Sequence, residues 1–169
     1  FNRVINQMKR DGLTLAPATV NDWHVNVCDT LSPLFDLQKK YVMRGRYLAA
    51  DGSPMPLVDN EKHKTVKKYL IEYRNIETGI PIFLTTKGMG SGRKKDDIQT
   101  QLSEWCGQAL LCDAYSGYDW IKKCGRVLCR CSAHARRDME RAMKENPKAA
   151  LPGMLLFQEI YGVEELIKH

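Results

Sequence analysis

The sequence contains no apolar run that approaches the roughly 20 residues of a membrane helix, so we do not expect a membrane protein. It also contains no internal repeats and no low-complexity segments. The first residue is Phe1 rather than Met, and no signal-peptide pattern follows it. We therefore expect a cytoplasmic chain that is an excerpt from a longer protein.

The sequence lacks the cysteine density of a disulfide scaffold, since the 169 residues contain six cysteines, at positions 28, 106, 112, 124, 129 and 131. Six are too few for a disulfide framework in a chain of this size. Most of them sit inside apolar runs such as Ala109-Leu110-Leu111-Cys112. We expect reduced thiols that pack as small hydrophobic side chains.

What the sequence does contain is an ordinary globular composition, with 43% hydrophobic and 27% charged residues. The net charge of +6 is unevenly placed. Residues 62–95 carry nine Lys and Arg against two acids, residues 120–150 carry nine against three, and residues 96–119 hold five acids and no base. Two basic blocks flanking an acidic stretch favour an anionic polymer as partner, although a solvated surface explains the composition equally well.

The first 44 residues predict a helical domain. A helix over 2–10 ends at Asp11-Gly12, a second helix covers 17–27, and a third begins at Ser32-Pro33 and continues to about residue 44. Helix, glycine turn and helix form the outline of a helix-turn-helix unit, which is a common outline and a weak signal for DNA binding.

Residues 45–169 predict an α/β domain that is truncated at its carboxyl end. The predicted strands cover 46–50, 68–74, 80–86, 108–112 and 126–131, and the predicted helices cover 96–106, 116–123, 133–145 and 154–168. We expect the first strand to end in the turn signal Asp51-Gly52-Ser53-Pro54, and Asp96-Asp97 to cap a helix. Three antiparallel strands followed by two strands joined through helices is the ribonuclease-H-like arrangement, a mixed five-stranded sheet with flanking helices.

In that arrangement Asp51 and Asp113 close two strands that lie side by side. Two metal ions about 3.5–4 Å apart catalyse phosphoryl transfer, and Mg²⁺ or Mn²⁺ prefers carboxylate oxygens. The last helix offers Glu159, Glu164 and Glu165 as a third ligand. The alternative is that each aspartate simply caps a turn.

Several motifs resemble those of the bacterial Insertion Sequence 66 family of transposases, whose catalytic core is of the DDE type. The resemblance covers nearly the whole chain, including residues 15–23 and 69–74. Asp51-Gly52-Ser53-Pro54-Met55 stands where the family has Asp-Glu-Thr-Pro-Val. The other matches are Asp113-Ala114-Tyr115-Ser116-Gly117-Tyr118 to Asp-Gly-Tyr-x-x-Tyr, Cys131-Ser132-Ala133-His134-Ala135-Arg136-Arg137 to Cys-Trp-Ala-His-Ala-Arg-Arg, and Ile160-Tyr161-Gly162-Val163-Glu164 to Leu-Tyr-x-Ile-Glu.

Carried over by position, the resemblance implies that Asp51, Asp113 and Glu164 are both the catalytic triad and the ligands of Mg²⁺ or Mn²⁺. A slip of one residue would select Glu165 instead. The chain departs from the family at Gly52-Ser53, where the family has Glu-Thr. The family's amino-terminal zinc-binding segment is absent, so this piece would bind metal and DNA but need not complete transposition.

Cys131 and His134 have the Cys-x-x-His spacing that recurs between the second and third acids of many DDE transposases. Zinc is one interpretation, with Cys129 as a third ligand. A closed zinc site needs four ligands, and Cys124, across a turn, is a distant candidate for the fourth. We expect no zinc in this piece, and we expect Cys131 and His134 to support the site, with His134 orienting a neighbour by hydrogen bonding or satisfying a helix start.

Five basic residues are the candidates for DNA contact. Arg136 and Arg137 begin a helix beside the presumed site, where arginine suits bidentate phosphate binding, although a salt bridge to Asp138 or Glu140 is equally plausible. Arg93-Lys94-Lys95 follow a glycine-rich stretch and bind DNA in one interpretation and water in the other.

The resemblance implies a DNA transposase that works in the bacterial cytoplasm at the nucleoid. Water would first cut at a transposon end, and the freed 3′ hydroxyl would then attack target DNA. The expected partners are the double-stranded DNA of both sites and a second copy of the chain in a homodimer, without a membrane. Two alternatives stay open, namely a metal-dependent nuclease of the same fold and an inactive DNA-binding remnant.

Overall fold

A computed structural model describes residues 2–59, 63–86 and 94–167. The chain divides into two compact units, Phe1–Tyr41 and Val42–His169. In the part of the chain that the structure describes, no helix combines the length and the apolar character that spanning a membrane requires.

The first unit consists of helix α1 (Asn2–Arg10) and most of helix α2 (Pro17–Met43), joined by a turn at Gly12. The predicted helix over 2–10 is confirmed. The predicted break at Ser32-Pro33 is wrong, because α2 continues through Pro33. A proline inside a helix costs about 3 kcal/mol, but no glycine or turn cluster accompanies it here, so the helical residues on both sides stay in one helix. That this segment acts as a helix-turn-helix unit stays a prediction.

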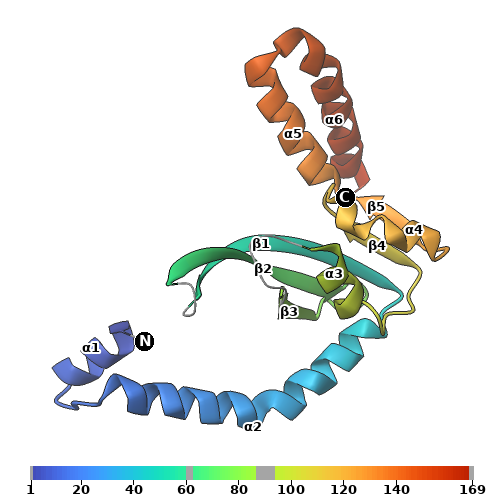
Figure 1. Cartoon of the computed structure of the whole chain (residues 1–169). Coiled ribbons are helices and arrows are strands. Elements are labelled where there is room, and N and C mark those ends of the chain that lie inside the picture. The colour runs from blue at the N-terminus through green and yellow to red at the C-terminus, as the bar shows by residue number, and fades with distance from the viewer. Residues whose placement is uncertain (1, 60–62, 87–93, 168–169) are drawn as a thin grey trace. The chain divides into compact units, whose positions relative to one another are not determined.

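The second unit is built on a mixed five-stranded sheet in the order β3-β2-β1-β4-β5 (Figure 1). The strands are β1 (Tyr47–Asp59), β2 (Lys64–Asn75), β3 (Pro81–Thr85), β4 (Ala109–Cys112) and β5 (Val127–Arg130). Strand β2 is antiparallel to both β1 and β3, whereas β4 is parallel to both β1 and β5. This architecture is consistent with the predicted ribonuclease-H-like core.

Strand β1 is longer than the sequence predicted. It does not end at Asp51-Gly52-Ser53-Pro54 but stays paired with β2 as far as Asp59. Its prolines are tolerated because of the register. The backbone of Tyr69, the partner of Pro54, bonds to Thr86 on the side away from β1, so the position of the missing N–H of Pro54 faces away from β2. Pro56 has the same parity, and neither proline removes a bond from the ladder.

The core lies on one face of the sheet. Buried residues alternate along the strands, as expected when one face is packed and the other is not. Helix α3 (Lys95–Gln101), the 3₁₀ turn η1 (Ser116–Tyr118) and helix α4 (Trp120–Lys123) contribute to the same core. The buried strand residues are Leu48, Ala50, Ile71, Tyr73, Ile82, Leu110 and Cys112, and those of the covering elements include Ile98, Leu102, Trp105, Tyr118 and Ile121.

Two helices follow the sheet, α5 (Ser132–Glu145) and α6 (Pro147–Ile167). The predicted start of the last helix at residue 154 is wrong, because α6 begins at Pro147 and includes Pro152. Asn146 caps this helix, since its Oδ1 accepts the N–H of Ala149 at 3.2 Å, and proline is favoured at the first helical position. The prediction that Asp96-Asp97 caps a helix is also wrong, since both lie in the first turn of α3 and Lys94 holds the cap position.

The cysteines differ from the sequence-based expectation. All six are free thiols, but Cys112 alone among them is buried. Cys28, Cys106, Cys124 and Cys129 are exposed, so the expected packing as small hydrophobic side chains is wrong for these four. An apolar run in the sequence does not reveal which of its residues faces the core.

A tryptophan locks the chain just before β1 to the chain just before β4. The buried indole N–H of Trp105 donates to the carbonyl oxygen of Gly45 at 2.9 Å. Gly107 lies directly against this pair, since an added Cβ would lie 2.3 Å from Nε1 of Trp105 and 2.5 Å from the oxygen of Gly45. Only glycine fits at this position, and its space is what allows β1 and β4 to start side by side.

This contact yields a stability prediction. Gly107→Ala should lower the free energy of unfolding by about 1–3 kcal/mol, because the Cβ forces Trp105 and Gly45 apart. Gly162→Ala is the matched control, since its Cβ would meet no atom within 4 Å inside α6, and alanine favours a helix by up to about 1 kcal/mol. Urea unfolding of both variants measures the change in the free energy of unfolding. Equal stabilities of the two variants would contradict the close contact of Gly107 with Trp105 and Gly45.

Candidate functional site

Asp51 and Asp113 are brought together by the parallel pairing of β1 and β4. The paired residues run from Tyr47 with Ala109 to Ala50 with Cys112, and the two aspartates are the next residues along the two chains. Neighbouring strands lie about 4.8 Å apart. The sequence placed both acids at strand ends, whereas the structure places Asp51 inside β1 at the point where its pairing with β4 stops.

A cavity of about 270 Å³ opens beside Asp51. Its lining comes from β1, β2 and β4 and from the region where α5 begins, and it consists of Ala49, Ala50, Asp51, Glu72, Arg74, Leu111, Cys112, Cys131 and His134. Glu72 is the ladder partner of Asp51, so the two carboxylates share a face of the sheet. Asp113 follows Cys112 but is not itself among the lining residues.

The two acids of this cavity differ in their partners. An oxygen of Glu72 accepts bonds from Nη2 and Nε of Arg74 at 2.7 and 2.8 Å, so an arginine already balances its charge. Asp51 is 61% exposed, and its Oδ1 accepts the N–H of Gly52 at 2.9 Å. Asp51 is therefore the carboxylate that remains available to a ligand in the cavity.

His134 and Cys131 lie next to Asp51. Nε2 of His134 is 3.8 Å from Oδ1 of Asp51, which is within ion-pair range but too long for a direct hydrogen bond. The His134 ring, close to the Cys131 thiol, lowers the pKa of that thiol, burial opposes the shift, and the N–H groups of His134 and Ala133 add to it.

Arg130 fixes the loop that carries Asp113, and the sequence analysis did not identify it. Nη1 donates to the carbonyl oxygens of Asp113 and Tyr115, and Nη2 pairs with the carboxylate of Asp119 at 2.5 Å. Oδ1 of Asp113 accepts the N–H of Tyr115 at 3.1 Å, which closes the turn from inside. In the sequence, Arg130 is recognisable only as the last residue of a strand. Its role becomes apparent once β5 is known to pair with β4, because Arg130 is then the partner of Cys112, the residue before Asp113.

Glu164 lies elsewhere in the described structure. It lines a second cavity of about 410 Å³ on the α5–α6 hairpin, together with Glu165, Arg136, Tyr161, Gln158 and Gly162. Arg136 pairs with Glu140 at 2.9 Å and lies 5.6 Å from the centre of the Tyr161 ring. The structure therefore groups Glu164 with Arg136 rather than with Asp51, and it adopts the salt bridge that was the alternative for Arg136.

The remaining basic candidates are exposed at helix starts. Lys94 and Lys95 begin α3, and Arg137 lies in the first turns of α5. Arg93 lies outside the described residues. The neighbour of Arg137, Asp138, pairs with Arg141 at 3.1 Å.

The donor chemistry at the sheet edge suits a hard cation only in part. Asp51 and Asp113 offer carboxylate oxygens, which Mg²⁺ and Mn²⁺ prefer. Among residues 2–59, 63–86 and 94–167, no three His, Cys, Asp or Glu side chains are grouped closely enough to hold a metal ion. Two of the three ligands that the sequence analysis named are thus neighbours along adjacent strands, and the third is apart.

Comparison with known proteins gives one result that covers the chain. The family model described as "Transposase IS66 family" matches residues 1–169, which is the whole sequence. No curated protein matches.

The contact between His134 and Cys131 yields a pH prediction. His134→Ala should raise the pKa of the Cys131 thiol, because the main group that stabilises its thiolate is removed. Alkylation of Cys131, followed peptide by peptide over a pH series, should then rise at higher pH than in the wild type. The profile of exposed Cys129 serves as internal control, and an unshifted Cys131 profile would contradict the assignment.

Arg130 yields a second prediction. Arg130→Ala should cost about 1–2 kcal/mol of stability, since its bonds are charged but about a third exposed. The amides of residues 114–119 should exchange faster with solvent, because their anchor is gone. Arg141→Ala removes an exposed ion pair of α5 and should cost no more than about 0.5 kcal/mol. Exchange rates unchanged by Arg130→Ala would show that the loop holds itself.

Proposed function

The chain belongs to the transposase IS66 family, and from this premise we propose that it cuts DNA at transposon ends and joins the freed ends to target DNA. The observation that carries the proposal is the neighbouring position of Asp51 and Asp113 after the last parallel pair of β1 and β4. Residues 45–169 would be the catalytic domain, and residues 1–44 a helical domain that precedes it.

Asp51 and Asp113 would hold divalent metal, Mg²⁺ or Mn²⁺, with Glu164 as the third ligand. A bound metal pair supplies an activated attacking oxygen and a stabilised leaving oxygen for phosphoryl transfer. The proposal for Asp51 and Asp113 is supported by the pairing of their strands. The proposal for Glu164 rests on the family pattern alone, because Glu164 lines the second cavity.

The other groups of the site would position and balance these acids. Arg130 holds the main chain of Asp113 through two carbonyl bonds, so the carboxylate of Asp113 starts from a fixed backbone. Arg74 neutralises Glu72, which lowers the repulsion that Glu72 would exert on Asp51 and on an approaching phosphate. His134 faces Asp51 within ion-pair range and would orient that carboxylate.

The proposed partners are double-stranded DNA of the transposon ends and of the target, and a second copy of the chain. Exposed basic residues at the start of α3 and in α5, including Lys94, Lys95 and Arg137, would contact phosphates, with Arg93 beside them in sequence. The logarithm of the binding constant would then fall linearly with the logarithm of the salt concentration. Each phosphate neutralised would steepen that slope by about 0.9. We place this activity at the bacterial nucleoid.

Substitution of one acid tests the proposed chemistry. Asp113→Asn in the full-length protein should lower cleavage of transposon-end DNA by roughly 100-fold or more, because losing a ligand removes several kcal/mol of transition-state stabilisation. Its affinity for DNA should not fall, since the attraction comes from Lys and Arg elsewhere. Cleavage is measured on labelled duplex in Mg²⁺ and in Mn²⁺.

Asp96→Asn is the control, because Asp96 is an exposed acid in the first turn of α3 and should leave cleavage unchanged. Cleavage by Asp113→Asn at the wild-type rate would refute the metal site. Cleavage by the wild type without joining to target DNA would instead identify a nuclease of the same fold.

A further inference from the structure

The sheet extends into a two-stranded ribbon, beside which the described residues place no further strand. Strand β4 pairs with β1 only over Tyr47–Ala50, and β3 pairs with β2 only over Leu70–Arg74. Farther along, from Met55 with Lys68 to Asp59 with Lys64, β1 and β2 pair only with each other among the described residues. We call these pairs the β1–β2 ribbon, and Figure 1 shows it projecting past the end of β3.

The ribbon is not built to receive another strand along its β1 edge. Pro54, Pro56 and Val58 stand at the positions whose N–H would point away from β2. Two of these three are proline, so this edge lacks two donors that an added strand would need. Proline and lysine are the residues by which natural sheets discourage such pairing. The side chains of the ribbon are therefore better suited to bind a partner than the backbone of the ribbon is.

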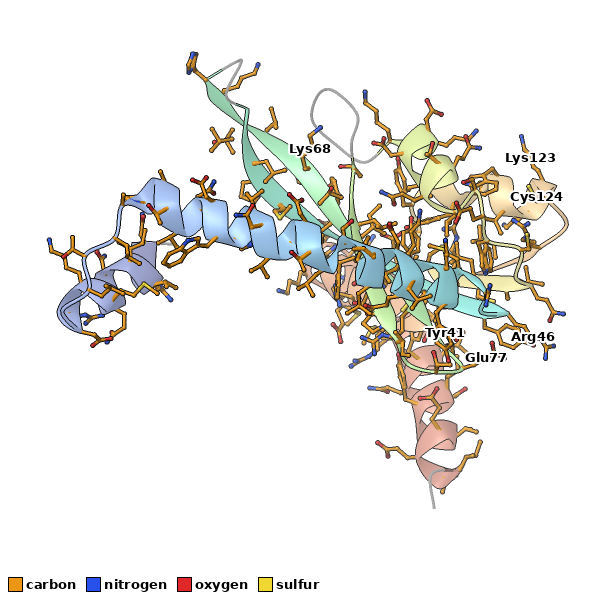
Figure 2. The ribbon with its side chains drawn as sticks, turned by 90° about the horizontal axis from the view of Figure 1, so that it is seen from below. Tyr41, Arg46, Lys68, Glu77, Lys123 and Cys124 are labelled. Atoms are coloured by element: carbon orange, nitrogen blue, oxygen red, sulfur yellow. The ribbon has the colours of Figure 1, made fainter. Side chains whose placement is uncertain are left out.

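The charged side chains of the ribbon are mainly cationic. Lys64, Lys67 and Lys68 all lie in the first five residues of β2, and the acid of the ribbon is Asp59 in β1. Lys64 and Lys67 are exposed, and Nζ of Lys67 lies 5.5 Å from the centre of the Tyr69 ring. Lys68 is half-buried, and Figure 2 shows it on the ribbon, away from Lys123 of α4. A cationic, solvent-exposed ribbon favours an anionic partner.

The register connects the ribbon to the acidic site. Side chains alternate between the two faces of a strand, so Lys64 and Lys68 share a face with Glu72 and hence with its partner Asp51, whereas Lys67 lies on the other face. At about 3.4 Å per residue, Lys68 lies about 14 Å along β2 from the Asp51–Glu72 pair, and Lys64 about 27 Å.

These distances can be expressed as base pairs of a duplex that runs along β2. Successive base pairs are 3.4 Å apart, so about 14 Å corresponds to about four base pairs and about 27 Å to about eight. The major groove admits a two-stranded β-ribbon. A duplex with its scissile phosphate at Asp51 can thus follow the lysine-bearing face of the ribbon.

We propose that the β1–β2 ribbon binds the duplex DNA that flanks the cleavage point, with Lys68 and Lys64 contacting phosphates about four and eight base pairs from it. The proposal rests on the proposed function, because the cleavage point is placed at Asp51. Asp59 opposes Lys64 in the ladder. These are backbone contacts, which position the duplex and carry no sequence information.

The test compares three variants of the full-length protein in a salt titration of binding to two unrelated duplexes. Lys64→Gln with Lys68→Gln should make the slope of log affinity against log salt shallower by about 1–2, because each lost phosphate contact removes about 0.9. Lys122→Gln with Lys123→Gln is the matched control, with the same charge change on exposed residues of α4. Helix α4 leads into the amino end of β5, whereas Asp51 lies beyond the carboxyl ends of the parallel pairs. Lys67→Gln tests the other face of the ribbon and should change the slope less.

Hydroxyl-radical footprinting gives the position of the contact. On transposon-end DNA, the lysine double variant should lose protection about four to eight base pairs from the cut on one side only, and the control pair should keep it. A slope and footprint equal to those of the wild type would overturn the ribbon proposal. An equal loss in the α4 control would do the same, since it would reduce the effect to net charge.

Failure of the proposed function is separately visible. A wild-type protein that binds duplex DNA but never cuts it refutes the proposed function, whereas a wild-type protein that cuts normally and a lysine variant that binds normally refute only the ribbon. A loss of affinity confined to single-stranded DNA would also overturn the proposal, because it specifies a duplex.

Discussion

The candidate site depends on three residues of β1 that are paired on both sides. Over Leu48–Ala50 the strand is antiparallel to β2 and parallel to β4. The parallel pairing brings the carboxyl end of β4 beside β1 and makes Asp51 and Asp113 neighbours. This pairing requires the chains before β1 and β4 to lie close together. The bond from Trp105 to Gly45 and the absence of a side chain at Gly107 allow this. The position of Asp51 and Asp113 after the last parallel pair therefore depends on a close approach of the backbones before the first pair.

The charges around the site are arranged by the same pairing. Cys112 pairs with Arg130 across β4 and β5, and this brings the guanidinium within reach of the carbonyl groups of Asp113 and Tyr115. Asp51 pairs with Glu72 across β1 and β2, and Arg74, two residues along on the same face, neutralises Glu72. Asp113 is thus held by an arginine of the neighbouring strand β5, and Glu72 is neutralised by an arginine of its own strand. The arginine of one pair bonds the backbone, and that of the other bonds a carboxylate.

Local sequence signals were reliable where one physical effect dominated. The alternation of apolar residues predicted four of the five strands to within a few residues, and the helix over 2–10 ended at Asp11-Gly12 as expected. They failed where proline was read without its context. Pro33 and Pro152 lie inside helices, and Pro54 lies inside β1, because in each case the cost of one missing N–H is smaller than the gain from extending the element. For Pro54 the register removes even that cost.

The sequence alone determined the family, the order of the five strands and the identity of the two acids that come next after the parallel pairs of β1 and β4, because these depend on residue types at fixed spacings. It could not determine that β1 continues past Asp51, that Arg130 holds the loop of Asp113, or that Glu164 shares a cavity with Arg136. Those facts depend on which strand lies beside which and in what register. A shift of one residue in the pairing would move every side chain to the opposite face, so only the tertiary structure decides which lysines share a face with Asp51.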